Sequence, residues 1–316
     1  MLPSNHHISQ QIKALARQMG FDACGIASAR KADEKHIQAL EDWLGSNGHG
    51  SMQYMDRNRE LRTDPDRLMP GVRSIVCLAL NYHQKDFQPA DCSFRISQYA
   101  AGVDYHVVIK TRLYQLMEQL MPILPAETAF RVFTDSAPVL EKFWATQAGL
   151  GAMGKNSCLI IPGKGSYFFL AEIFLNIELE YDKPFARDLC GKCTRCMEAC
   201  PTSAITAPGK VHAPLCLSYQ TIEKKDPVSP EVAPHLNGFV FGCDICQDVC
   251  PHNQRFARPC AEPLFQPLPA IQHWGNQEWQ QMDIAVFNKN FRKTKSPLAR
   301  AGFPKLCDTI RKVKKD

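Results

Sequence analysis

The sequence has no long, uninterrupted apolar stretch. Its longest apolar runs are short and broken, as in Phe168 to Leu175, where Glu172 interrupts the series. A helix that spans a membrane needs about 20 consecutive apolar residues, so we expect no membrane association. The first residues also lack the basic patch and apolar core of a secretory signal peptide. We therefore expect a cytoplasmic protein.

Neither of two common nucleotide-binding motifs is present in the context that its fold requires. No segment reads GxxxxGK(S/T), the loop that cradles phosphates. The stretch from Gly149 to Gly154 does read GxGxxG, but it follows a predicted helix. The dinucleotide-binding fold places these glycines directly after a strand. The sequence therefore gives only weak support for a nucleotide cofactor.

The chain carries little net charge outside its C-terminal segment. The whole sequence has 37 Lys/Arg and 32 Asp/Glu, which gives +5. Residues 291–316 alone hold nine Lys/Arg and two Asp, a net of +7, so the remainder is nearly neutral at −2. Such a segment can bind phosphate and release counterions, or it can be a solvated C-terminal helix. Charge alone leaves both interpretations open.

The composition and periodicity indicate a folded α/β (α+β) domain over residues 1–184, followed by two smaller parts. Hydrophobic residues make up 45% and charged residues 22%, as in globular proteins. From residue 185 to 255, cysteine, proline and short polar loops dominate, which predicts a segment held by metal more than by a core. Residues 256–316 read as a helical segment with the basic tail. Within 1–184 we expect helices at 8–19, 103–120 and 139–148, strands at 21–27, 73–81 (central) and 130–134, and a strand pair of 157–161 with 167–179 around a Pro-Gly-Lys-Gly turn.

Fourteen cysteines are many for a chain of this size, and disulfides are rare in a cytoplasmic protein. Two runs have the spacing of bacterial iron–sulfur proteins, C-x2-C-x2-C-x3-C-P. The first run is complete and ends at Cys200. The second ends at Cys250 but has Val240 where its first cysteine should stand. Since the last cysteine of each run ligates the other cluster, Cys216 is expected to supply the missing ligand.

We therefore predict two 4Fe–4S clusters in a ferredoxin-like segment. Structural zinc is the alternative, because paired CxxC motifs also bind zinc, but the CxxCxxC runs and both Cys-Pro endings favour cubanes. The first cluster takes Cys190, Cys193, Cys196 and Cys250. The second cluster takes Cys200, Cys216, Cys243 and Cys246. The other cysteines show no ligand spacing and are expected to be mostly buried small apolar residues: Cys24, Cys77, Cys92, Cys158, Cys260 and Cys307.

Besides the cysteine runs, several further segments carry a family resemblance that covers nearly the whole chain. With the cysteine runs, their combination resembles the epoxyqueuosine reductase family, the iron–sulfur and cobalamin enzymes of queuosine tRNA modification. Reductive dehalogenases share some of these features and remain an alternative, as does an electron-transfer ferredoxin. The segments are RTDPDRLMPGVRSI from Arg62, ISQYAAGVDYH from Ile96, FTDSAPVLEKFWA from Phe133, GLGAMGKNSCLII from Gly149, CLSYQTIEKK from Cys216, GCDICQDVCPHN from Gly242 and SPLARAGF from Ser296.

The resemblance implies a cobalamin-binding domain that receives electrons from the clusters and reduces epoxyqueuosine to queuosine at the wobble position of tRNA. By its motif position, Asp135 is the expected proton donor. A carboxyl group against a corrin face would be desolvated, which would raise its pKa toward that of a useful acid. The alternative is that Asp135 caps the following helix.

The resemblance also implies contacts for the cofactor and the substrate. We expect Lys224, with Lys225 and the basic tail, to contact tRNA phosphate. His106 is expected to begin a helix and not to ligate cobalt, because the usual Asp-x-His-x-x-Gly loop is incomplete. The electron donor is unidentified, and we expect a monomer. The candidate cobalamin contacts are Arg62, Ser97, Asp135, Lys155, Cys158, Phe169, Ser218, Cys243 and Asp244.

Overall fold

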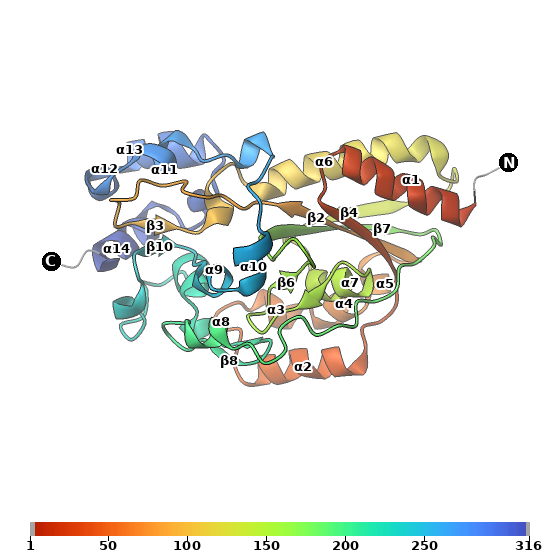
Figure 1. The fold of residues 1–316 in the computed structure, drawn as a ribbon, viewed down its shortest axis with the longest axis horizontal. Coiled ribbons are helices and arrows are strands. Elements are labelled where there is room, and N and C mark those ends of the chain that lie inside the picture. Colours follow the sequence, from red (N-terminus) through yellow and green to blue (C-terminus); the bar gives the residue numbers. More distant parts are fainter. Residues whose placement is uncertain (1–3, 314–316) are drawn as a thin grey trace.

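A four-stranded antiparallel sheet forms the centre of the N-terminal part (Figure 1). The computed structural model describes residues 4–313. The strand order is β1 (Ala23–Ser28), β2 (Ser74–Asn81), β7 (Phe168–Leu175) and β4 (Phe130–Phe133), and every neighbouring pair runs antiparallel. Of the two classes that the sequence left open, this pairing is that of an α+β fold. The prediction that residues 73–81 form an inner strand is confirmed.

Both faces of the sheet are covered because β2 and β7 are apolar on both sides. On one face, α1 (Asn5–Gln18) and α6 (Tyr105–Leu120) pack their apolar residues against the sheet. On the other face, α7 (Glu141–Gln147) inserts Phe143 and Trp144 into a second core. Figure 1 shows these helices on opposite sides of the strands, with α2 (Glu34–Gly45) further out below α7. The helices predicted at 8–19, 103–120 and 139–148 are thus confirmed.

The predicted pairing of residues 157–161 with 167–179 is wrong. The shorter strand, β6 (Leu159–Ile160), pairs with β5 (Ala152–Met153) in a separate hairpin. β7 instead crosses into the main sheet between β2 and β4. Only an isolated bridge from Ile161 to Gly165 closes the Pro-Gly-Lys-Gly turn. The apolar residues of β7 are buried more fully between two long-range partners than a local hairpin would allow, so burial decided the pairing.

The cysteine-rich segment consists of short elements between loops. Both runs contain a short helix, α8 (Arg195–Glu198) in the first and α9 (Ile245–Asp248) in the second, and the two helices pack together. A small hairpin of β8 (Ile205–Ala207) and β9 (Lys210–Val211) follows α8. The second run leads into α10 (Pro251–Phe256), whose proline occupies the first turn, where its missing N–H costs nothing.

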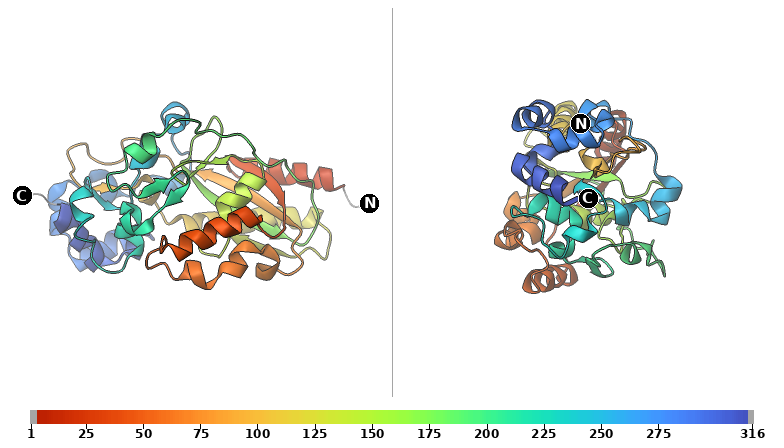
Figure 2. Two further views of the ribbon diagram at one scale, coloured as in Figure 1. Left: turned by 90° about the horizontal axis from the view of Figure 1, so that it is seen from below. Right: turned by 90° about the vertical axis from the view of Figure 1, so that its left-hand side faces the viewer.

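A third core joins distant parts of the chain. β3 (Arg95–Ile96) runs parallel to β10 (Phe239–Phe241), and both pack against the C-terminal helices. Figure 2 shows this end of the molecule opposite the main sheet. The C-terminal helices are α11 (Pro269–His273), α12 (Asn276–Gln281), α13 (Ile284–Phe287) and α14 (Phe303–Val313).

The basic tail therefore contributes to a folded core. Leu306 and Ile310 of α14 are buried, and so is Lys305, whose ammonium group donates to the Asp226 carbonyl. The predicted C-terminal helix is confirmed, and residues 314–316 lie outside the described range. The division of the chain at residues 184 and 255 stays a prediction. Between residues 4 and 313, no helix combines the length and apolarity needed to cross a membrane.

Candidate active site and cluster-binding segment

Asp135 stands in a constrained turn directly after β4. Its backbone has φ of +52°, a left-handed conformation that few non-glycine residues adopt. Its N–H donates to the carboxylate of Glu141, the first residue of α7. The residue that caps α7 is Leu140, without a side-chain bond. The alternative interpretation of Asp135 as a helix cap is therefore wrong, and its carboxyl group is free for other partners.

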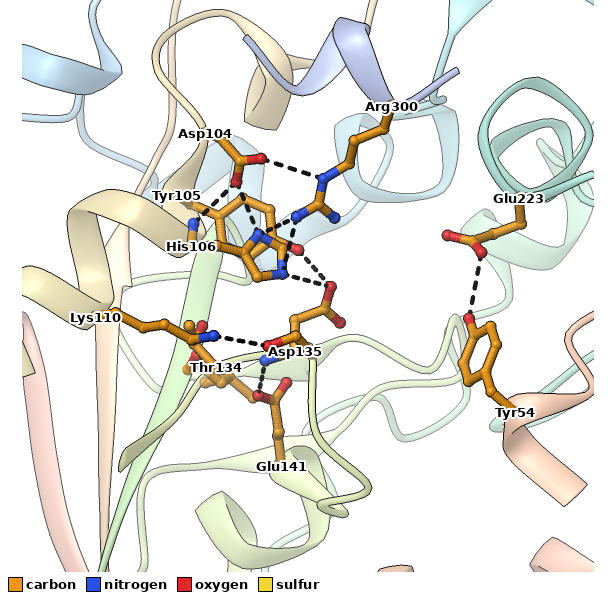
Figure 3. A network of polar contacts seen from close by, with 12 residues as sticks. Tyr54, Asp104, Tyr105, His106, Lys110, Thr134, Asp135, Glu141, Glu223 and Arg300 are labelled. Carbon is orange, nitrogen blue, oxygen red and sulfur yellow. Dashed lines mark hydrogen bonds and ion pairs between the residues drawn. The ribbon is translucent and has the colours of Figure 1, made fainter. Parts of the chain in front are cut away.

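Two side chains from the start of α6 bind the carboxylate of Asp135 (Figure 3). The Tyr105 hydroxyl donates to Oδ2 over 2.6 Å, and Nε2 of His106 lies 3.4 Å from the same oxygen. The side chain of Asp135 is nevertheless 55% exposed, whereas that of His106 is only 10% exposed. The carboxyl group is thus held on one side and open on the other, as a group that must meet a ligand requires.

A second layer orients His106. Its Nδ1 lies 2.8 Å from Oδ1 of Asp104, the residue that caps α6. The guanidinium of Arg300 donates from Nε to the other oxygen of Asp104 over 3.2 Å and also contacts the His106 ring. Both imidazole nitrogens of His106 therefore face carboxylates, and the prediction that His106 lies at a helix start is confirmed.

These contacts set opposite pKa shifts on the two partners. Burial alone would raise the pKa of Asp135, but the bonds from His106 and Tyr105 outweigh it, so the pKa lies below its ordinary value. For His106, burial lowers the pKa, but the bonds to Asp104 and Asp135 prevail and raise it. The protein's own groups therefore favour the carboxylate form of Asp135, and the raised pKa expected beside a corrin stays a prediction.

Buried polar groups line the floor of the site. Burial raises the pKa of Glu141 to about 8. Glu172, at the centre of β7, is fully buried, and neither carboxyl oxygen has a hydrogen-bond partner within residues 4–313. Burial raises the pKa of Glu172 well above its ordinary range. Both carboxyl groups are thus stable in the neutral form, which limits the charge beside Asp135.

The cysteine segment offers free thiols that accept backbone N–H bonds. All fourteen cysteines are free. The N–H of Ala204 donates to Sγ of Cys200 over 3.2 Å, and backbone N–H groups also bind the sulfurs of Cys216 and Cys243. Hydrogen bonds of this kind stabilise iron–sulfur thiolates and tune their potentials. The donor set therefore fits 4Fe–4S clusters.

Comparisons with known proteins find family matches for the cysteine-rich segment and for the segment that contains Asp135. Residues 189–253 match the family described as "4Fe-4S double cluster binding domain". Residues 62–136, which contain Asp135 and its partners from α6, match the family described as "Epoxyqueuosine reductase QueG, DUF1730". The epoxyqueuosine reductase of Cellulophaga algicola is 44% identical over 286 residues, which covers 90% of this chain and 92% of that protein. The chain belongs to the epoxyqueuosine reductase family.

Solved structures agree with this assignment. A crystal structure of epoxyqueuosine reductase with an epoxyqueuosine-modified tRNA-Tyr stem loop superimposes with a TM-score of 0.83 at 28% identity, over 94% of this chain and 80% of that chain. The Bacillus subtilis epoxyqueuosine reductase gives 0.81 at 27% identity over the same shares, and its structure is described with the catalytic loop swung out of the active site. The prediction of the family and of two 4Fe–4S clusters is confirmed.

The candidate cofactor contacts fall into three groups. Arg62, in α4 (Arg59–Thr63), is buried, and its pKa is lowered by burial and raised in part by Tyr54, Glu141 and Asp135. It thus belongs electrostatically to the Asp135 site. Phe169 is the second residue of β7 and stacks on Tyr105 with ring centroids 4.1 Å apart. These two candidates, Arg62 and Phe169, surround Asp135.

A second group lies against the second cysteine run. Ser97 donates to Oδ1 of Asp244, and the N–H of Gln98 donates to Oδ2 over 2.8 Å. Asp244, next to Cys243, is thus occupied by the loop after β3. Ser218 directly precedes the π-helical turn Tyr219–Glu223. All of these residues lie near the predicted second cluster.

The third group consists of Lys155, which serves the first cysteine run, and Cys158. Lys155 donates from Nζ to the carbonyls of Gly191 and Cys193 over 2.8 and 2.9 Å. These bonds hold the loop of the first run and engage the ammonium group. Cys158 is partly buried, which raises its pKa, and its N–H donates to Asn156, whose side-chain amide donates to the Cys246 carbonyl of the second run. As cobalamin contacts, Lys155 and Cys158 stay predictions.

Several site residues escaped individual prediction. Tyr105, Glu141 and Arg300 all bind the Asp135 loop or its supporting layer. Each stands inside a segment that carries the family resemblance, and that placement was the available signal. Across the site, Tyr54 is 49% exposed and donates from its hydroxyl to Glu223 over 3.3 Å. No pattern in the sequence distinguishes Tyr54.

Proposed function

We propose that this protein reduces epoxyqueuosine to queuosine in tRNA, with Asp135 as the proton donor. The observation that carries the proposal is the half-exposed carboxyl group of Asp135, which Tyr105 and His106 hold in a chain that also bears a double-cluster segment. The reaction removes the epoxide oxygen as water and leaves an alkene. It consumes two electrons and two protons, so the site must supply both.

The arrangement around Asp135 supports a role in proton transfer. His106, with a raised pKa, and Tyr105 both reach Oδ2, so a proton that leaves the carboxyl group can be replaced along these bonds. Arg300 and Asp104 hold the imidazole in place. When the cofactor and substrate cover the open side, the loss of water favours the neutral carboxylic acid. Asp135 then becomes a donor within reach of the epoxide oxygen.

Cobalamin fits the residues that face Asp135. Nε of Arg62 is buried and has no hydrogen-bond partner within residues 4–313, and such a donor is expected to find an acceptor when a ligand binds. The amide-rich edge of a corrin provides such acceptors. When bound, the cofactor would supply strongly reduced cobalt. Arg62, Ser97, Phe169 and Ser218 are the residues proposed to hold it, while Asp244 orients Ser97.

Substrate binding is proposed at the segment after Cys216. Lys224 follows Glu223, which binds Tyr54 at the rim of the Asp135 site. The ammonium group of Lys224 donates to the Ser229 hydroxyl. Lys305 and Lys312 donate to backbone carbonyls of the same loop, at Asp226 and Val228. Three cations thus gather around residues 226–229. Phosphates of an anticodon loop would be drawn to this cluster.

The proposal is tested by an anaerobic assay of the iron-loaded protein on tRNA that carries epoxyqueuosine, with and without cobalamin. Mass spectrometry of the digested nucleosides reads the product. We expect cobalamin-dependent loss of one oxygen from the modified base. No conversion by protein that holds both clusters and corrin would contradict the proposed function and leave the cluster assignment intact.

A further inference from the structure

The two cysteine runs differ in how deeply they lie. Residues 183–203, which hold the first run, include no buried residue. Around the second run, by contrast, Phe241, Asp244 and Gln247 are buried, and Leu217 and Tyr219, beside Cys216, are buried as well. The first predicted cluster therefore lies at the surface and the second in the interior, next to the Asp135 site.

Two segments form a continuous face over the surface cluster. His252, in α10, contacts the Leu189 carbonyl from Nε2 over 2.9 Å. Arg195, in α8, reaches the Gln254 side chain over 3.5 Å. Residues 187–198 and 251–258 are thus tied together around the ligands of the first cluster, and we name these two segments the entry face.

The entry face is positively charged. It carries Arg187, Lys192, Arg195, Arg255 and Arg258, all exposed, against two carboxylates. Within residues 4–313, none of these five cations lies close enough to a carboxylate to form an ion pair.

The two carboxylates of the entry face bind neutral donors and pair with none of its cations, and five cations against two carboxylates give the face a net charge of +3. Asp188 accepts the N–H of Cys190 over 2.8 Å, and Glu198 accepts the Thr194 hydroxyl. Two of the arginines lie over aromatic rings, Arg187 on Phe185 and Arg255 on Phe256. Stacking holds these guanidinium groups at the surface, where a partner can reach them.

We propose that the entry face docks a small acidic protein that carries single electrons, such as a flavodoxin, and that electrons enter at the cluster of Cys190, Cys193, Cys196 and Cys250. Each encounter oxidises the carrier by one electron and reduces the surface cluster by one. Two encounters supply the two electrons of one turnover, so the partner deepens the proposed function and rests on it. Opposite charges would speed the encounter and align the two redox centres.

The charge is better explained by a protein partner than by tRNA. The substrate must reach Asp135, and the cations near that site belong to another segment, around Lys224. The entry face instead surrounds the ligands of the exposed cluster. A basic face at this place favours a partner whose task is to approach that cluster.

The test follows cluster reduction and needs neither tRNA nor cobalamin. The iron-loaded protein is mixed with reduced flavodoxin in a stopped-flow instrument, and the loss of cluster absorbance is recorded at low and high ionic strength. In the double variant Lys192→Glu and Arg195→Glu, we expect the rate to fall about tenfold or more at low salt, with a weaker salt dependence. Reduction by dithionite, which needs no docking, should be unchanged.

Matched variants make the result decisive. Lys35→Glu with Lys85→Glu reverses two other exposed cations that form no ion pair within residues 4–313, and should leave the flavodoxin rate at the wild-type value. If the first double variant loses iron, Arg255→Glu, which lies in α10 outside the ligand loop, repeats the test. An unchanged flavodoxin rate in iron-replete variants would overturn the proposal. So would a loss of tRNA affinity without a change in cluster reduction, since the face would then bind RNA.

Discussion

The hydroxyl of Tyr105 lies 2.6 Å from Oδ2 of Asp135. This bond connects the first turn of α6, which packs on one face of the sheet, to the loop after the edge strand β4. Tyr105 is itself fixed, because its ring stacks on Phe169 of β7. Through this aromatic side chain, the sheet helps to fix the position of the candidate proton donor.

Replacement of Asp135 by asparagine keeps the size of the side chain and removes its acidic group. A positioned acid contributes about 10²–10⁴-fold to a rate, so we expect Asp135→Asn to reduce turnover by at least about a hundredfold while corrin binding, read by absorbance, is retained. Asp86→Asn is the matched control, because Asp86 is also an aspartate with positive φ but is exposed outside the site. Full activity of Asp135→Asn would refute the role.

Removal of the Tyr105 hydroxyl should change the pH profile. That hydroxyl stabilises the carboxylate form of Asp135 and so lowers its pKa. In Tyr105→Phe we expect the pKa of Asp135 to rise. Because the acid form is the active one, the pH at which the rate declines should then be higher than in the wild type. A profile with the same alkaline limb would show that Tyr105 only fills space.

The ligand role of Cys216 is tested by iron content. Two 4Fe–4S clusters hold about eight iron atoms per chain. Cys216→Ser removes one predicted thiolate of the interior cluster, so we expect iron to fall toward about half that value. Cys24→Ser alters a partly buried free cysteine outside both runs and should retain the full amount. Equal iron in both variants would assign the fourth ligand elsewhere.

The ion pair of Arg112 with Glu262 joins α6 to the C-terminal segment. The carboxylate side chain is only 7% exposed, so Arg112→Met would leave a buried charge without its partner. Such a loss costs about 3–5 kcal/mol, which urea denaturation would register as a lower midpoint. Arg17→Met, at an exposed arginine of α1, should change the free energy of unfolding by no more than about 0.5 kcal/mol.

Lys224 should contribute to tRNA affinity through charge. We expect Lys224→Ser to weaken binding and to reduce the slope of log affinity against log salt by about one. Lys225→Ser, at the neighbouring exposed lysine, shows whether the effect on the salt slope depends on the position of the lost charge. Deletion of the tail is a poor test, because α14 buries Leu306 and Ile310 and its removal would expose the third core. Identical salt slopes for wild type and Lys224→Ser would exclude a phosphate contact.

The features that could be predicted from the sequence are those fixed by local patterns. The spacing of the cysteines predicted both clusters, and the apolar run of residues 73–81 predicted an inner strand. The partners of β7 could not be predicted, because pairing depends on which distant strand offers the better buried surface. The contact of Arg300 with Asp104 joins residues 196 positions apart in the sequence, and no periodicity encodes it.

The contact of Arg300 with the catalytic layer also has a consequence for biosynthesis. Chains emerge from the ribosome with the N-terminal part first, at about 5–20 residues per second. The sheet, Asp135 and both cysteine runs can all be present while residue 300 is still inside the exit tunnel. His106 then lacks the guanidinium that braces it, and the third core lacks α14. The proton-transfer layer is therefore completed only after residue 300 has left the tunnel, later than the segments that hold the predicted cluster ligands.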